Sequence, residues 1–372
     1  MESINFVRNF IRDIILANYL LYADSLETIQ PDEEAINRQI VDSMARVSCA
    51  VFDRHRHATR NAHAKSHGIL KGELIVAPDL PAYLAQGVSA RPTRYPAIIR
   101  LSSSPGEISA DAKAAARGFA LKILNVLGEK VLANDSSHSQ DFLLVNSPVI
   151  AFGNAARYQT LQTLLEANEQ SEHGCPHRVE VIPPVIDSSL KEILTTLAAA
   201  TSDHILGETF YSMAAIRFGD YVAKVRVVPA SAEIKALTGV PIETRDGESV
   251  FRDRVVSFFK RNSAQYDLQV QLCTGVSAMP IEDASVEWPE TLSPFETVAR
   301  IVIPVQDAYS PARRVYGDDV LSFNPWHAIT AHRPLGSIMR VRKLAYEHSS
   351  QFRHAMNVQP RMEPAQLSDV PD

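Results

Sequence analysis

The 372-residue sequence predicts an antiparallel α+β protein. Strand-like runs occur between about residues 68 and 150, helical patterns follow over 155–200, and strand-like runs return from 211 to 304. Strands and helices do not alternate strictly, so parallel βαβ units are not indicated. With 45% hydrophobic and 22% charged residues, the composition is that of an ordinary soluble globular protein with enough chain for a large core.

The first 50 residues are expected to form a helical arm. Apolar residues recur at helical spacing from Ile4 to Leu16, and again from Ile36 to Val47 after the break at Pro31. The charges on this segment are mixed, whereas a membrane-surface helix would favour a face rich in lysine and arginine. Packing on the same domain or on a neighbouring subunit is the preferred interpretation, and contact with lipid is the alternative.

The remaining elements follow from local pattern. Apolar and β-branched runs bounded by Pro, Gly and Ser predict strands at Gly72–Ala77, Ala97–Ser102, Phe119–Leu124, Tyr211–Phe218, Tyr221–Val228, Gln265–Leu272 and Val298–Pro304. Leucine stripes predict helices near Leu161–Leu165 and Leu190–Leu197, with a simple polar loop at Glu172–His177 between them. Residues 305–345 are expected to be rich in loops, and a last helix carries Tyr346 before a polar tail.

Charge, cysteine content and hydropathy exclude several classes of protein. A net charge of −6 gives no reason to expect a nucleic-acid partner. Cys49, Cys175 and Cys273 are odd in number and widely spaced, which argues against a disulfide framework. No apolar run is long enough to span a bilayer, and charged residues interrupt the N-terminus where a signal peptide would be apolar. A cytoplasmic protein is expected.

The last predicted helix carries a pattern that suits a haem ligand. Arg342 and Tyr346 are four residues apart and therefore lie on the same face of that helix. The guanidinium group could hydrogen-bond the phenol oxygen and hold it as phenolate, the form that ligates ferric haem. The alternative is a surface arginine beside a half-buried tyrosine, and the remaining sequence has to decide between the two.

Several further short segments occur in a fixed order along the chain. They are Arg60-Asn61-Ala62-His63-Ala64-Lys65, Arg100-Leu101-Ser102, Ala110-Asp111, Arg117-Gly118-Phe119-Ala120-Leu121-Lys122, Val145-Asn146-Ser147-Pro148, Trp288-Pro289 and Phe323-Asn324-Pro325. Their order, and the separation of His63 from Arg100, resemble those of the haem catalases. The chain therefore resembles the haem catalase superfamily from about Arg54 to Arg353, in a short form similar to catalase and to catalase-related allene oxide synthase.

This resemblance implies a fold, a cofactor and an assembly. The fold would be a catalase-like antiparallel β-barrel with surrounding helices and a buried haem b. We expect an N-terminal helical arm over 1–50, a single haem domain over 51–360 and a polar tail over 361–372. Nothing after Tyr346 could form the C-terminal domain of larger catalases, so the chain would be a minimal version. Family members also suggest a homo-oligomer.

The resemblance assigns roles to individual residues. Haem carries two carboxylates, whose burial requires cationic partners, and the arginines that match the family's are Arg60, Arg100 and Arg353. Any one of them alone would be explained as a surface ion pair. Tyr346 would be the axial ligand of the iron, supported by Arg342.

On the other side of the haem, His63 would act as general acid–base, moving a proton from one peroxide oxygen to the other so that the O–O bond breaks heterolytically. Ser102 would orient its ring and Asn146 would donate a hydrogen bond to the peroxide. His55, His57 and His67 crowd the same segment, but no cysteine or carboxylate completes a familiar zinc site. His67 would share the face of His63 if this segment were helical.

Two departures from true catalases bear on the substrate. Ala62 replaces the valine usual before the catalytic histidine, and the segment after His63 carries an extra residue before its strand. Both favour a roomier pocket. The chain is expected to cleave hydrogen peroxide or organic, fatty-acid hydroperoxides. The alternatives are a hydroperoxide isomerase or lyase without catalase activity, and a haem-binding protein without turnover.

Overall fold

The structure is a computed structural model that describes residues 19–174 and 203–372. The apolar stripe expected at Ile4–Leu16, the one at Leu190–Leu197, and Cys175–His177 of the expected polar loop lie outside these residues. The first part of that loop prediction is wrong, because Glu172–Gly174 form the end of a helix. The described strands are β1 (Lys65–Val76), β2 (Arg94–Ser103), β3 (Arg117–Leu124), β4 (Ser139–Val145), β5 (Phe210–Tyr211), β6 (Ile216–Phe218), β7 (Tyr221–Pro229), β8 (Ala264–Leu272) and β9 (Glu296–Ile303).

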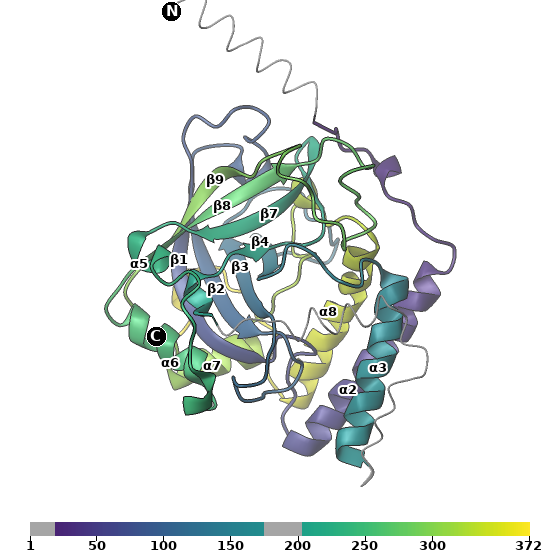
Figure 1. Ribbon diagram of the computed structural model, residues 1–372, viewed down its shortest axis with the longest axis vertical. Helices are drawn as coiled ribbons and strands as arrows, with labels where there is room; N and C mark the ends of the chain where they lie inside the picture. The colour runs from purple at the N-terminus through teal and green to yellow at the C-terminus, as the bar shows by residue number, and fades with distance from the viewer. Residues whose placement is uncertain (1–18, 175–202) are drawn as a thin grey trace, which may run out of the picture.

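The strands form one antiparallel sheet that closes into a barrel (Figure 1). Their order is β5-β4-β3-β2-β1-β9-β8-β7-β6, and a further pairing of β5 with β7 joins the two ends of the row. Eight strands therefore form the closed ring, and β6 extends it as the hairpin partner of β7. The expected α+β fold with an antiparallel β-barrel and surrounding helices is confirmed.

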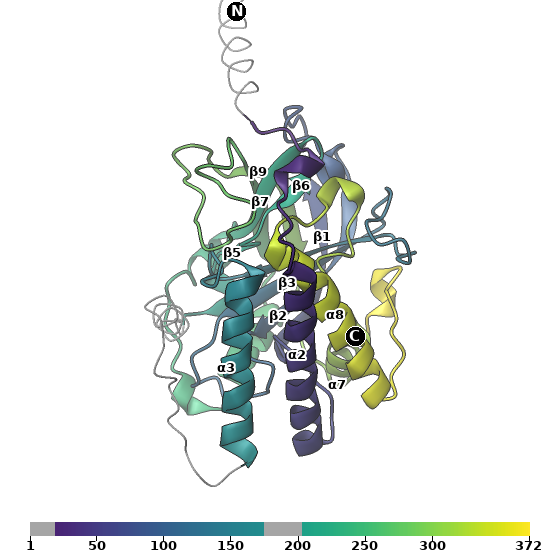
Figure 2. The same cartoon turned by 90° about the vertical axis from the view of Figure 1, so that its right-hand side faces the viewer.

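The α-helices are α2 (Glu33–His55), α3 (Ala155–Gly174), α5 (Ala232–Lys235), α6 (Val250–Phe259), α7 (Pro311–Val315) and α8 (Ser337–Met356). Short 3₁₀ turns occur at η1 (Asp24–Leu26), η2 (Gly87–Ser89), η3 (Ile205–Gly207), η4 (Thr244–Asp246), η6 (Thr330–His332) and η7 (Leu367–Asp369), and η5 (Tyr316–Val320) is a π-helical turn. The long helices α2, α3 and α8 pack together on one side of the barrel (Figure 2). Ile40, Ala155 and Val341 form the small apolar cluster that joins them.

Strand β2 shows how the barrel wall separates core from site. Alternate residues of a strand face opposite sides of the sheet. Ile99 and Leu101 are fully buried in the core of the barrel, so Arg100 and Ser102 face outward. That outer face is not exposed to solvent, because the chain before β1 and helix α8 cover it. The space between the wall and this cover forms the cavity described below.

Three boundaries differ from the sequence predictions. Strand β1 starts at Lys65 rather than Gly72, and its register with β2 shifts between Ser66 and Gly68, so His67 is the extra residue of a bulge. The strand expected at Tyr211–Phe218 is two short strands, because Met213 has a left-handed φ of 60° that interrupts it. The loop-rich region ends earlier than expected, since α8 already starts after Gly336.

The two described chain ends pack against the barrel. Leu20 donates its backbone N–H to the Cys273 carbonyl at 2.8 Å. At the other end Val370 is buried with Ile69 and Ile98 of β1 and β2, and Arg313 donates to the Pro371 carbonyl at 2.9 Å. Within the described ranges, no helix combines the length and apolarity that crossing a membrane requires.

Candidate functional site

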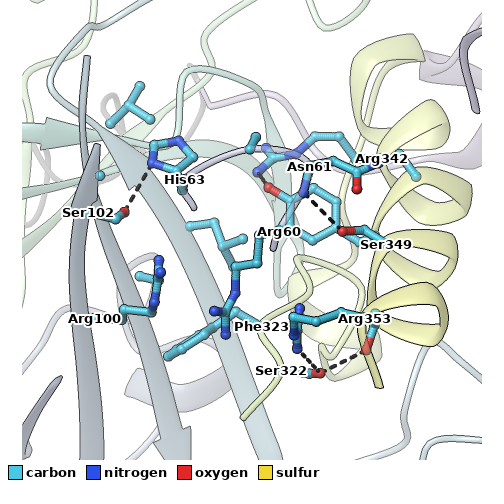
Figure 3. A pocket seen from close by; sticks show the side chains of 18 of the residues that line it. Arg60, Asn61, His63, Arg100, Ser102, Ser322, Phe323, Arg342, Ser349 and Arg353 are labelled. Atoms are coloured by element: carbon cyan, nitrogen blue, oxygen red, sulfur yellow. Dashed lines mark hydrogen bonds between the residues drawn. The ribbon is translucent and has the colours of Figure 1, made fainter. Parts of the chain in front are cut away.

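A cavity lies between the outer face of strands β2–β4 and helix α8 (Figure 3). Counted out to its open mouth, it holds about 790 Å³ of space between protein atoms. The sequence-predicted residues that line it are Arg60, His63, Arg100, Ser102, Arg342, Tyr346 and Arg353. Ala62 also lines it, whereas Asn146 does not, although its neighbour Val145 does.

His63 lies just before β1, in an unusual backbone conformation. Its φ of 57° is left-handed, and its N–H donates to the Ser104 carbonyl at 2.9 Å. The next residue, Ala64, donates its N–H to the Pro105 carbonyl at 3.0 Å. A left-handed non-glycine residue is costly and persists where its surroundings fix it. The two hydrogen bonds on consecutive residues supply that constraint and direct the imidazole into the cavity.

The imidazole of His63 is held by one side chain. Its Nδ1 lies 3.0 Å from Ser102 Oγ on β2. Nε2 has no hydrogen-bond partner among the described residues, so it is the ring atom available to a ligand. Burial, reinforced by the positive charges of Arg100, Arg342 and Arg60, lowers the pKa of His63 to about 3. The ring is therefore neutral at neutral pH and able to accept a proton.

Gly118 on β3 makes room for this pair. A Cβ added to Gly118 would lie 2.6 Å from His63 Nδ1 and 2.7 Å from Ser102 Oγ. Both distances are shorter than ordinary van der Waals contact. The His63–Ser102 hydrogen bond thus requires that the strand facing it have no side chain at this position.

Three arginines line the cavity below His63 in Figure 3, of which Arg100 and Arg353 are buried and Arg60 is largely buried. Burial, and then the positive charges of Arg100 and Arg353, lower the pKa of Arg60 well below its ordinary value. Burial, and then the charge of Arg100, lower the pKa of Arg353 to about 10. The main counterion is Asp318 of η5, 3.0 Å from Arg100 Nη2 and 3.6 Å from Arg60 Nη1.

Arg353 makes weaker contacts than the other two arginines. Its Nη2 donates to the Leu321 carbonyl at 3.2 Å and to Ser322 Oγ at 3.3 Å, and its buried Nε has no partner among the described residues. A buried cation without sufficient counter-charge is costly. The cluster is therefore suited to bind an anionic group, and a carboxylate matches the planar donors of arginine.

Helix α8 contributes Tyr346 and Arg342 to the cavity. Arg342 Nη2 donates to the Tyr346 hydroxyl at 2.9 Å, and its guanidinium carbon lies 5.1 Å from the centroid of the ring. This is the contact that the four-residue spacing predicts for a helix. Arg353, two turns later, projects from the same helix, so α8 carries a phenol and an anion-binding group into one cavity.

Asn146 follows β4 and is held by hydrogen bonds at both ends of its amide. Its Oδ1 accepts from the backbone N–H of Arg117 at 2.7 Å, and its Nδ2 donates to Glu208. The Asn146 side chain therefore lies beside Arg117 and Glu208 at the end of β4, next to Val145, which lines the cavity.

The other histidines of the segment have separate partners. His67 Nε2 lies 2.7 Å from Ser103 Oγ, and its ring is 5.6 Å from that of Phe251, away from the cavity. His55 is 3.0 Å from Glu107 and His57 is 2.9 Å from Asp319. In the part of the chain that the structure describes, no three His, Cys, Asp or Glu residues are arranged to hold a metal ion.

Sequence reasoning missed several residues of the site. Gly118 and Phe323 are within quoted motifs, but nothing in those motifs indicated that Gly118 faces His63. Asp318 carried no signal, because its importance depends on contacts with Arg60 and Arg100, which are distant in sequence. Asn61 and Ser349, joined by a 3.3 Å contact from the Asn61 N–H to Ser349 Oγ, are further polar residues of the lining.

Comparison with known proteins places the fold. Neither a family model nor a curated protein sequence matches the chain. A fungal catalase structure aligns with a TM-score of 0.58 at 18% identity, covering 83% of this chain and 62% of that one. Catalase A from Saccharomyces cerevisiae gives 0.56 at 16% identity, covering 85% and 67%. A bacterial catalase gives 0.58 at 14% identity, covering 93% and 66%. The chain therefore has a catalase-like fold and spans about two thirds of the length of these proteins.

Proposed function

We propose that this protein is a haem-dependent enzyme that cleaves the O–O bond of peroxides. The observation that carries the proposal is the cavity on a catalase-like barrel. It brings the His63–Ser102 pair, the Arg342–Tyr346 pair and the buried arginine cluster together. A chance occurrence of the sequence motifs would not be expected to place these groups around one space.

The residues of the cavity fit haem b. The two carboxylates of haem would bind to Arg60, Arg100 and Arg353, whose excess positive charge and unpartnered Arg353 Nε call for an anion. Tyr346 would ligate the iron, and the Arg342 donor at 2.9 Å would stabilise its phenolate form. Ferric haem, when bound, would supply the iron centre at which the peroxide is oxidised or reduced.

The chain itself would move the proton. Neutral His63, with a pKa of about 3, can accept a proton at Nε2 from one peroxide oxygen and return it to the other. Ser102 would keep the ring oriented through Nδ1. Asn146 would assist with a hydrogen bond to the peroxide through the amide N–H that Glu208 does not use.

The substrate class follows from the lining. Ala62 lines the cavity and is exposed, so the position beside His63 carries only a methyl group. We infer that organic hydroperoxides, including those of fatty acids, are substrates alongside hydrogen peroxide. The same feature supports a second candidate, a hydroperoxide isomerase or lyase. A haem carrier without turnover is less well supported, because binding haem requires neither His63 nor Ser102.

Tyr346→Phe tests the haem assignment. It removes the phenol oxygen and should cause loss of haem or a changed visible spectrum. Tyr83→Phe is the matched control, because Tyr83 lies outside the cavity and its hydroxyl donates to Glu296 at 3.1 Å. Unchanged haem content and spectrum in Tyr346→Phe would refute the assignment.

Stopped-flow absorbance with two substrates tests the reaction. The haem-loaded protein is mixed separately with hydrogen peroxide and with a polyunsaturated fatty-acid hydroperoxide. Oxygen release or consumption of an electron donor identifies the catalase or peroxidase reaction, and a rearranged lipid product without a donor identifies the isomerase. No reaction with either substrate would refute an enzymatic role.

A further inference from the structure

The orientation of the Asn146 amide is determined by one hydrogen-bond donor and one hydrogen-bond acceptor. A backbone N–H can only donate, so the atom that faces Arg117 N at 2.7 Å must be the amide oxygen. The amide nitrogen then faces Glu208, whose carboxylate can only accept. One N–H of the amide is bound in this way, and the other N–H has no partner in the part of the chain that the structure describes.

Among the described residues, the Glu208 carboxylate has no hydrogen-bond partner other than the Asn146 amide. Glu208 is the residue after η3, it is partly buried, and its Oε1 has no hydrogen-bond partner in the described chain. The charged groups that act on it are Arg117 and Asp203. The Arg117 guanidinium instead donates to Ser103 Oγ at 3.1 Å and to the Ala115 carbonyl at 2.7 Å. The contact with Asn146 is therefore the main hydrogen bond of this carboxylate.

The Asn146–Glu208 contact lies one residue from the wall of the cavity. Val145, which precedes Asn146, lines the cavity and pairs with Gly118 across β3 and β4. Gly118 in turn faces the His63 ring. A change in how Asn146 is held is thus transmitted over a short distance to the space beside His63.

We propose that Glu208 is a positioning residue that anchors the Asn146 amide and directs its second N–H for use by the substrate. The proposal rests on the proposed function, in which Asn146 assists His63. An ionised Glu208 forms a charge-assisted hydrogen bond, which is stronger than the bond to a protonated carboxyl group. The anchoring should therefore be present when Glu208 is ionised and weaken when it is protonated.

This change should occur near neutral pH. Burial raises the pKa of Glu208 to about 7, although the Asn146 hydrogen bond and the charge of Arg117 oppose the rise. His63, with its pKa of about 3, does not titrate in the same range. The assistance from Asn146 should thus be complete above pH 7 and decline below it.

The test observes Asn146 directly. In protein labelled with ¹⁵N-asparagine, the Asn146 side-chain amide signal is identified by its loss in Asn146→Ser and followed with pH. We expect a midpoint near pH 7 that disappears in Glu208→Gln, which can still accept the hydrogen bond but cannot titrate. Glu296→Gln is the matched control, because Glu296 is another partly buried glutamate with a raised pKa and its partner is Tyr83.

A signal that does not move with pH, or a midpoint that survives in Glu208→Gln, would overturn the proposal. In the haem-loaded protein, turnover should fall up to about tenfold below neutral pH, the size of one hydrogen bond, and the fall should vanish in Glu208→Gln. If the amide titrates as expected but peroxide is not turned over, the positioning contact stands and the proposed reaction is wrong.

Discussion

Gly118→Ala should impair turnover without removing haem. The added methyl carbon would lie 2.6 Å from His63 Nδ1 and 2.7 Å from Ser102 Oγ. Ordinary contact is about 3.5 Å, so the ring or the hydroxyl has to move by about 1 Å. The ring can move because it borders the cavity, so folding and haem binding should survive. A displacement of about 1 Å in a reacting group costs on the order of 100-fold in rate.

The assay measures haem content from the visible spectrum and initial peroxide turnover in the same preparations. Gly275→Ala is the matched control, because a Cβ at Gly275 would meet no atom of the described residues within 4 Å. Neither glycine has a left-handed φ, so the two substitutions differ in steric contact and not in backbone strain. Parent-like turnover in Gly118→Ala would refute the reasoning, and so would a loss of turnover in strict proportion to lost haem.

Three further predictions concern named side chains. His63→Ala should keep haem and lose about 100-fold or more of peroxide turnover; activity lost in His67→Ala instead would identify His67 as the proton-transfer residue. Ala62→Val should slow a bulky organic hydroperoxide more than hydrogen peroxide in parallel assays, and equal effects would contradict the substrate proposal. Burial lowers the pKa of His332 from 6.5 to about 4, so the folded protein favours the neutral imidazole. The resulting contribution to the free energy of unfolding is complete above pH 6.5 and is lost as the pH falls towards 4. His332→Gln should reduce the pH 7 to pH 4 difference in unfolding free energy by about 3 kcal/mol, measured by denaturant titration at both pH values; an unchanged difference would contradict this.

Contacts within one element were predictable from the sequence. The Arg342–Tyr346 hydrogen bond follows from helical spacing alone, and the outward direction of Arg100 and Ser102 follows from alternation along a strand. Local pattern located most of the described strands, because apolar runs bounded by Pro and Gly are a local signal. That His63, Arg60 and Arg353 meet in one cavity came from the resemblance to a family and not from spacing.

Contacts between distant elements were not predictable. Asn146 and Glu208 are 62 positions apart, and Asp318 is 218 positions from Arg100. The Asn146–Glu208 pair depends on the pairing of β4 with β5, and β5 has only two residues. The Arg100–Asp318 pair depends on where η5 packs against β2. The sequence indicated an extra residue after His63 but not that it forms a bulge at His67. One extra residue in a strand leaves the hydrophobic pattern on either side unchanged.

The left-handed backbone at His63 affects how its variants should be chosen. At a φ of 57°, glycine and asparagine are tolerated, whereas alanine retains a steric penalty and a β-branched residue adds to it. A loss of activity in His63→Val would therefore combine the missing imidazole with a distorted chain before β1. His63→Asn preserves the local conformation and isolates the contribution of the ring. The same constraint limits which residues natural variation can place at this position, because most replacements would disturb the fold as well as the chemistry.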